Sequence, residues 1–266
     1  MTDPTAVTGP LDLSPAPGAA PSVQRLLAQA RLELRMMLSN GEQLLLTLVI
    51  PLVVLLGLGA TTVVDVGGGA TRAGRLDVVL PGVLALAVLS TAFTGLAIQT
   101  GFERRYGVLK RLGATPLTRG LLLGGKAVAV LVVEAVQVVV LVSVAVALGW
   151  RPEGFDVLLS AALLLLGTAC FASLGLLLAG VLRAEATLAA ANAIYLVLLV
   201  AGGIAVPLDR WPAGVARVVE LLPSAALAEG LRHAFAGHAV GWTPWLVLVG
   251  WTVLAVLLVR RTFRWQ

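Results

Sequence analysis

Glu134 is the ionisable side chain that stands deepest within an apolar stretch of this chain, and Gln137 follows it by about one helical turn. An ionisable group at membrane depth is costly, so it typically marks an ion or substrate path or bonds to another helix. Asn192 and Tyr195 interrupt a later apolar stretch in the same way. We expect these four side chains either to line a pathway or to form hydrogen bonds between helices.

Residues 120–126 fit the phosphate-loop pattern G-x-x-x-x-G-K, in which backbone amides and a lysine hold nucleotide phosphates. The next position should be Ser or Thr to bind magnesium, but it is Ala127, and no strand is predicted before it. The segment is better interpreted as the start of a helix capped by Thr115 or Thr118. Its glycines would let another helix approach, and Lys126 would extend to the lipid headgroups.

The composition excludes most other chemistry. Hydrophobic residues make up 59% of the 266 residues, charged residues 12%, and the mean hydropathy is +0.97, which indicates a membrane protein. A single cysteine allows no disulfide within the chain, and two histidines without nearby cysteine predict no metal site. The net charge of +5 is explained by basic residues that flank apolar stretches, so nucleic acid is not an expected partner.

Continuous apolar stretches predict an all-α membrane protein with one membrane domain, 22–266, after a disordered tail, 1–21. Residues 22–39 are amphipathic but too charged to span, so they predict a helix lying at the interface. Its apolar side chains are expected to lie on one face, with charged residues such as Glu33 on the rest. Six transmembrane helices are expected at 43–63, 79–101, 119–149, 157–182, 186–206 and 243–260.

The distribution of basic residues predicts the orientation. With six spans both termini share one side, and that side has thirteen of the nineteen Lys and Arg residues. The positive-inside rule therefore places both termini in the cytoplasm.

A charged block at 102–113 interrupts the apolar sequence on this cytoplasmic side. Phe102, Tyr106, Leu109 and Leu112 recur at helical spacing, and Gly113 would end the helix. The opposite face would present Glu103, Arg104, Arg105, Lys110 and Arg111. This pattern predicts a short amphipathic helix on the membrane that docks a soluble partner; a solvated basic loop is the alternative.

The segment 207–242 falls on the other side of the membrane. Trp211 begins an apolar stripe that ends before Pro223, and 225–236 could form a second short helix. We expect a helical pair that enters the outer leaflet or caps the spans, with an ordinary external loop as the alternative.

These motifs resemble the type-2 ABC exporter permeases, especially the daunorubicin-resistance and nodulation-export types. The family pattern around the cytoplasmic block is matched at Glu103, Gly107, Leu109, Leu112, Pro116, Leu117 and Lys126. The second half is similar through Asn192, Gly202-Gly203, Pro207, and Pro223 to Leu231-Arg232. Glu134 departs from the family, which usually has apolar or small residues in this span.

The resemblance implies a permease subunit of an ATP-driven exporter in the bacterial cytoplasmic membrane, possessing no enzymatic activity or cofactor of its own. Two permease subunits, identical or different, would form the pathway in contact with membrane lipid. Soluble ATP-binding-cassette subunits would supply ATP and magnesium.

The coupling helix implied by the resemblance comprises Phe102, Glu103, Arg104, Arg105, Tyr106, Gly107, Leu109, Lys110 and Arg111. The external gate would comprise Pro207, Trp211, Pro223 and Arg232. An ion-coupled secondary carrier that uses Glu134 is the main alternative function, and a membrane anchor or assembly factor is a third.

Overall fold

The structure is a computed structural model that describes residues 18, 20–39, 41–60, 71–151, 154–204 and 207–262. All regular secondary structure in this part of the chain is helical, and the predicted disordered tail, 1–21, lies almost wholly outside it. The elements in chain order are α1 (Ser22–Ser39), α2 (Gly41–Ala60), α3 (Arg72–Val88), η1 (Leu89–Gly95), α4 (Leu96–Arg105), α5 (Val108–Gly113), α6 (Arg119–Ala147), α7 (Val157–Val181), α8 (Ala184–Ala201), η2 (Leu208–Arg210), α9 (Ala213–Val219), α10 (Pro223–Phe235) and α11 (Trp242–Thr262).

Five helical stretches among the described residues are long and apolar enough to cross a bilayer. They are Arg72–Arg105, Gly120–Ala147, Val157–Val181, Ala184–Ala201 and Trp242–Arg261. The helix α2 adds a shorter apolar stretch, Thr47–Gly59, with Pro51 inside it. The all-α membrane architecture is therefore confirmed, although the first of the six predicted spans is shorter in its apolar part than the other five.

The longest helix runs through the centre of the bundle. The α-helices α3 and α4 are joined without a break by the π-helical segment η1, and together they cover Arg72–Arg105. These 34 residues measure about 51 Å, well beyond the roughly 30 Å hydrocarbon core. The predicted span 79–101 lies within this helix, which continues beyond it at both ends. Gly175 of α7 packs onto η1, where a Cβ atom would lie 2.7 Å from the Phe93 carbonyl oxygen.

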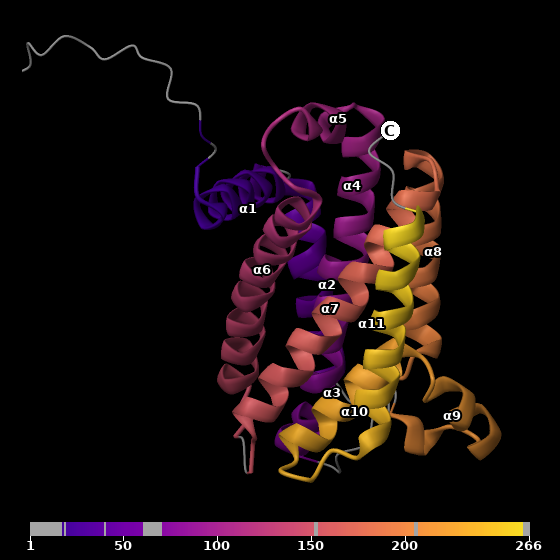
Figure 1. Ribbon diagram of the computed structural model, residues 1–266. Coiled ribbons are helices and arrows are strands. Elements are labelled where there is room, and N and C mark those ends of the chain that lie inside the picture. The colour runs from indigo at the N-terminus through magenta and orange to yellow at the C-terminus, as the bar shows by residue number, and fades with distance from the viewer. Residues whose placement is uncertain are drawn as a thin grey trace, which may run out of the picture.

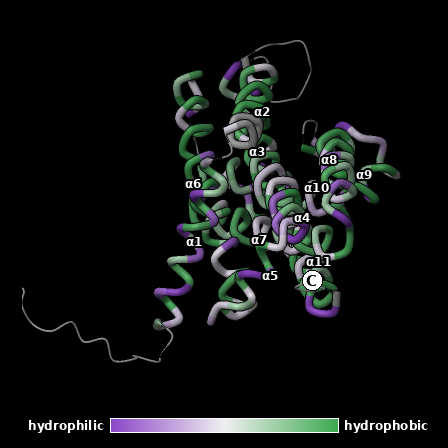
Figure 2. Tube along the Cα trace, turned by 90° about the horizontal axis from the view of Figure 1, so that it is seen from above, coloured by the Kyte–Doolittle hydropathy of each residue, from purple (hydrophilic) through white to green (hydrophobic). Residues whose placement is uncertain are grey.

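The remaining helices surround this central helix. In Figure 1, α1 and α5 lie at one end of the bundle and α9 and α10 at the other. The helix α1 packs against α6, α11 against α7, and α8 against α4. Figure 2 shows hydrophobic residues along most helices and hydrophilic ones on α1 and near α5. Side chains such as Val139 and Val200 are exposed on the outside, as a surrounding bilayer requires.

The segment after α8 forms the predicted pair of short helices, α9 and α10. The helix α10 is buried against α3, α7 and α11, whereas α9 lies at the edge of the bundle with most of its residues exposed. Neither helix is long enough to span a bilayer.

Candidate functional site

A buried cluster of charged side chains joins three helices at the end of the bundle where α5 lies. The Nζ atom of Lys126 in α6 lies 2.9 Å from Glu33 Oε2 in α1 and 2.6 Å from Glu103 Oε2 in α4. The exposed fractions of Lys126, Glu33 and Glu103 are 1%, 1% and 7%. Charges this deeply buried require partners, so the pairing ties the three helices together.

Two glutamine side chains complete this cluster, which we call the Lys126 cluster. Gln29 donates to Glu33 Oε1 at 2.6 Å. Gln99 donates to Glu33 Oε2 and to Glu103 Oε1, each at 2.9 Å. Two carboxylates share one ammonium group, and burial raises the pKa of Glu33 above its ordinary value, with Lys126 opposing and Glu103 adding to that rise.

Close approach of α1 to α6 at this site depends on glycine. A Cβ atom at Gly125 would lie 2.5 Å from Gln29 Cγ, and one at Gly124 would lie 3.0 Å from Leu26 Cδ1. The prediction that these glycines admit a neighbouring helix is therefore correct. Thr118 caps α6 as expected, since its hydroxyl accepts from the Leu121 amide.

Lys126 itself corrects the prediction from sequence. It was expected to extend to lipid headgroups, but it is almost wholly buried and bound to two carboxylates. The face of α1 that packs on the protein includes polar residues: Gln29 and Glu33 are buried, whereas Val23 and Leu27 of the apolar face are exposed. In a membrane protein the apolar side chains of an interfacial helix can face lipid and its polar ones can face the protein.

The block 102–113 is two helical segments rather than the single helix predicted. The central helix ends at Arg105, Gly107 adopts a left-handed conformation with φ 69°, and α5 follows. Glycine adopts this conformation at little steric cost, so Gly107 sets the direction of α5.

The first half of this block faces the protein more than solvent. Glu103 is part of the Lys126 cluster. Arg104 donates to the carbonyl oxygens of Gly180, at 2.6 Å, and Leu182. Arg105 pairs with Glu185 at the start of α8. Both arginines thereby fix the turn between α7 and α8, a role that was not predicted.

The second half of the block remains accessible. Leu109 is buried, whereas Tyr106 is 63% exposed and Lys110 and Arg111 are exposed beside it. Phe102 stacks on Tyr106 with ring centroids 6.1 Å apart. Tyr106, Lys110 and Arg111 are therefore part of the surface at this end that a soluble protein could contact.

The four polar residues predicted inside the spans occupy different environments. Glu134 accepts a 2.5 Å hydrogen bond from Thr168 of α7. Gln137 accepts from Thr91 of η1 and donates to the Thr47 carbonyl oxygen of α2. These bonds link neighbouring helices, which is one of the two roles expected for these residues. The other two residues, Asn192 and Tyr195, lie on α8, with Asn192 exposed and Tyr195 buried. The structure does not bring the four together into one site.

The residues predicted to form an external gate lie at the opposite end of the bundle. Pro207 precedes η2, Trp211 follows it, and Pro223 is the first residue of α10. Arg232 of α10 pairs with Glu229 at 2.5 Å and donates to the carbonyl oxygens of Gly203 and Ile204. These contacts attach α10 to the segment that follows α8.

The described fold and the Lys126 cluster define a multi-pass helical membrane protein. Residues 24–236 match the family described as ABC-2 type transporter, so the chain belongs to the ABC-2 type transporter family. The chain is also similar to a Bacillus subtilis (strain 168) protein named "Putative transport permease YvfS". The two are 23% identical over 181 residues, which cover 68% of this chain and 74% of the relative. The resemblance predicted from the motifs is confirmed, and the chain is a transporter permease.

Proposed function

We propose that this chain is the membrane-spanning permease subunit of an ATP-driven exporter, powered by a separate ATP-binding-cassette subunit. The supporting observation is the position of the Lys126 cluster, which ties α1, α4 and α6 together next to the exposed surface of Tyr106, Lys110 and Arg111. A force applied to α5 would therefore move three helices as one unit. The ABC-2 family membership supports the same assignment.

The remaining parts of the complex belong to the same proposal. ATP and magnesium would bind to the soluble subunit, and residues 120–126, which lie at the start of α6, would serve helix packing. A second permease subunit, identical or different, would complete the pathway. The external gate would be the α9–α10 segment with Pro207, Trp211, Pro223 and Arg232.

The orientation can be tested with cysteine labelling. Native Cys170 is buried, so a Cys170→Ala background leaves single introduced cysteines as reporters. We expect Ala213→Cys in α9 to react with an impermeant thiol reagent added outside intact cells, and Thr115→Cys next to α5 to react only after the membrane is opened. The reverse pattern would contradict a bacterial plasma-membrane orientation with both termini in the cytoplasm. Both positions are exposed, and neither has the left-handed backbone of Gly107.

ATP coupling is tested on the exposed surface of α5. Reversing both charges in Lys110→Glu/Arg111→Glu should weaken docking of the ATPase, because each exposed charge contact contributes up to about 1 kcal/mol. We expect about a tenfold loss of co-purified ATPase and of permease-stimulated ATP hydrolysis. Arg104 is unsuitable for this test because it holds backbone carbonyls.

The matched control is Arg151→Glu/Arg217→Glu, which reverses two exposed arginines elsewhere on the surface. It should leave complex formation and hydrolysis unchanged. If the α5 variant also behaves like the unmodified protein, α5 is not the docking surface.

Ion-coupled transport through Glu134 is the second candidate function. Glu134 is 6% exposed, and its Oε1 atom has no hydrogen-bond partner among the described residues. Such a carboxylate inside a span is a candidate to bind an ion. The exporter proposal, in contrast, requires Glu134 only for contact between α6 and α7.

Glu134→Gln separates these functions. Thr168 also donates to the Leu164 carbonyl oxygen at 2.8 Å, so it retains a partner and the variant should assemble normally. In inverted vesicles with fluorescent lipophilic dyes added to the bath, we expect ATP-driven dye uptake by the variant to persist within a few-fold after an ionophore collapses the proton gradient. Dye movement that depends on the gradient and disappears in the variant would favour the carrier. Glu134→Leu is the second variant, since it removes hydrogen bonding at the same position.

A further inference from the structure

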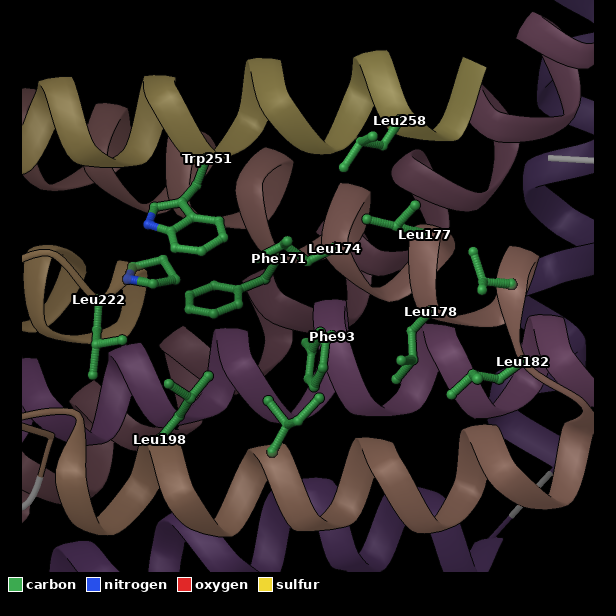
Figure 3. A pocket seen from close by; sticks show the side chains of 13 residues that line it. Phe93, Phe171, Leu174, Leu177, Leu178, Leu182, Leu198, Leu222, Trp251 and Leu258 are labelled. Atoms are coloured by element: carbon green, nitrogen blue, oxygen red, sulfur yellow. The ribbon is translucent and has the colours of Figure 1, made fainter. Parts of the chain in front are cut away.

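An apolar cleft with a cavity volume of about 620 Å³ lies between α8 and α11. Figure 3 shows side chains from both helices and from α7 converging on it. Every residue that lines the cleft is apolar or aromatic, including Phe93 of η1 and Phe171 of α7 in its depth. A ligand with polar groups would find no hydrogen-bonding side chain there other than the Trp251 ring nitrogen, which already donates to the Leu221 carbonyl oxygen.

The cleft opens towards the outside of the bundle. Phe93 and Phe171 are 4% and 0% exposed, whereas Val181, Ile194 and Leu258 are 59%, 38% and 37% exposed. The helix α8 packs on α4 and α11 packs on α7, which leaves the gap between α8 and α11 to be filled from outside. All three surrounding helices are long and apolar enough to cross a membrane, so lipid can reach the mouth of the cleft.

The part of the cleft along α7 is about as long as one leaflet is thick. Along α7 it extends from Phe171 to Leu182, and eleven residues of helix measure about 16 Å. Half of a hydrocarbon core is about 15 Å thick.

Two basic residues stand at the end of the cleft near α5. Arg183 follows Leu182, and Arg261 lies one helical turn beyond Leu258; both are exposed. The nearby Arg104 and Arg105 are already bound to backbone carbonyls and to Glu185. Within the described residues, the guanidinium groups of Arg183 and Arg261 have no hydrogen-bond or ion-pair partner. Both groups are therefore available to an anionic group outside the protein.

We propose that this cleft binds one acyl chain of an anionic phospholipid from the leaflet at the α5 end, with the phosphate held by Arg183 and Arg261. The apolar walls fit the chain, the part of the cleft along α7 matches one leaflet, and guanidinium groups bind phosphate well. The site depends on the membrane-spanning fold and is independent of the proposed ATP coupling. A lipid held here would fill the gap between α8 and α11.

Trp251 lines the cleft and provides a test in the full-length protein reconstituted into vesicles. Phosphatidylcholine vesicles would contain a minor fraction of either phosphatidylglycerol or phosphatidylcholine that is brominated on its acyl chains. The fluorescence of Trp251 is obtained by subtracting the fluorescence of the Trp251→Phe protein from that of the unmodified protein. We expect brominated phosphatidylglycerol to quench it with an apparent affinity about tenfold higher than that of brominated phosphatidylcholine.

Two variants separate the headgroup site from the cleft. Arg183→Gln/Arg261→Gln changes only exposed residues and should remove the preference for phosphatidylglycerol while quenching continues. Ile194→Trp should narrow the mouth of the cleft and reduce quenching by both lipids. It is made both in the otherwise unmodified protein and in the Trp251→Phe protein, so that the fluorescence of Trp251 is again obtained as a difference. Equal quenching by both lipids in the unmodified protein would refute the phosphate site. Absence of quenching by either would show that protein fills the cleft, and would overturn the proposal.

Discussion

Replacing Lys126 with methionine should release α1 from the bundle. The change removes the ammonium group that two buried carboxylates share, and an uncompensated buried charge costs about 3–5 kcal/mol. We expect the free energy of local opening of α1 to fall by about 3 kcal/mol, which corresponds to roughly 100-fold faster amide hydrogen exchange in α1. Amides in α7 should keep their exchange rates, because α7 contributes no residue to the cluster.

The matched control restores neutrality. Lys126→Met/Glu33→Gln/Glu103→Gln removes all three charges with little change in volume, and neutral replacements of buried ion pairs are often tolerated. Exchange in α1 should then return most of the way to that of the unmodified protein. If Lys126→Met alone exchanges like the unmodified protein, the cluster does not hold α1.

The Lys126 cluster also predicts that the docking of α1 depends on pH. Burial raises the pKa of Glu33 above its ordinary value of 4.5. At a pH between these two pKa values, Glu33 keeps its proton when α1 is docked and loses it when α1 is undocked. The stabilisation is therefore complete below pH 4.5 and is lost as the pH rises through the raised pKa. Exchange in α1, corrected for the intrinsic effect of pH, should become faster over this range, and Glu33→Gln should remove the trend.

The spans were predictable because apolar length is a property of single segments. The described helices α6, α7, α8 and α11 lie close to the predicted ranges. The long central helix was underestimated, since its first turns include the charged residues Arg75 and Asp77. Both side chains are bound in the fold: Arg75 donates to the Leu58 carbonyl oxygen, and Asp77 accepts from Trp150.

The Lys126 cluster was not predictable as a site, although two of its residues were identified. Lys126 and Glu103 match the family pattern, but Glu33 lies 93 residues from Lys126 and its partner is set by packing. A usable signal was present in the spacing. Gln29 and Glu33, like Gln99 and Glu103, are separated by four residues and so lie on one helical face. The prediction of an interfacial helix did not show that this polar face would pack against the bundle.

Arg232→Leu should be the most disruptive single change at the α9–α10 end. Arg232 pairs with Glu229, donates to the Gly203 and Ile204 carbonyl oxygens at 2.9 and 2.8 Å, and reaches the Val78 carbonyl oxygen at 3.4 Å. Removing the guanidinium group leaves these partly buried carbonyl oxygens without this donor and leaves Glu229 with only the Leu208 amide, at a cost of about 3 kcal/mol or more.

We therefore expect the purified Arg232→Leu protein to unfold at a temperature about 10 °C lower. The unfolding temperature of Arg232→Lys should fall between those of Arg232→Leu and the unmodified protein, because one ammonium group cannot replace a planar group that bonds in several directions. Arg217→Leu is the control, since Arg217 is exposed on α9, and it should change the unfolding temperature by little. Equal unfolding temperatures for Arg232→Leu and Arg217→Leu would show that Arg232 does not hold α10. A large loss would mean that any opening at this end breaks the Arg232 contacts, which makes Arg232 the restraint that a gate there must overcome.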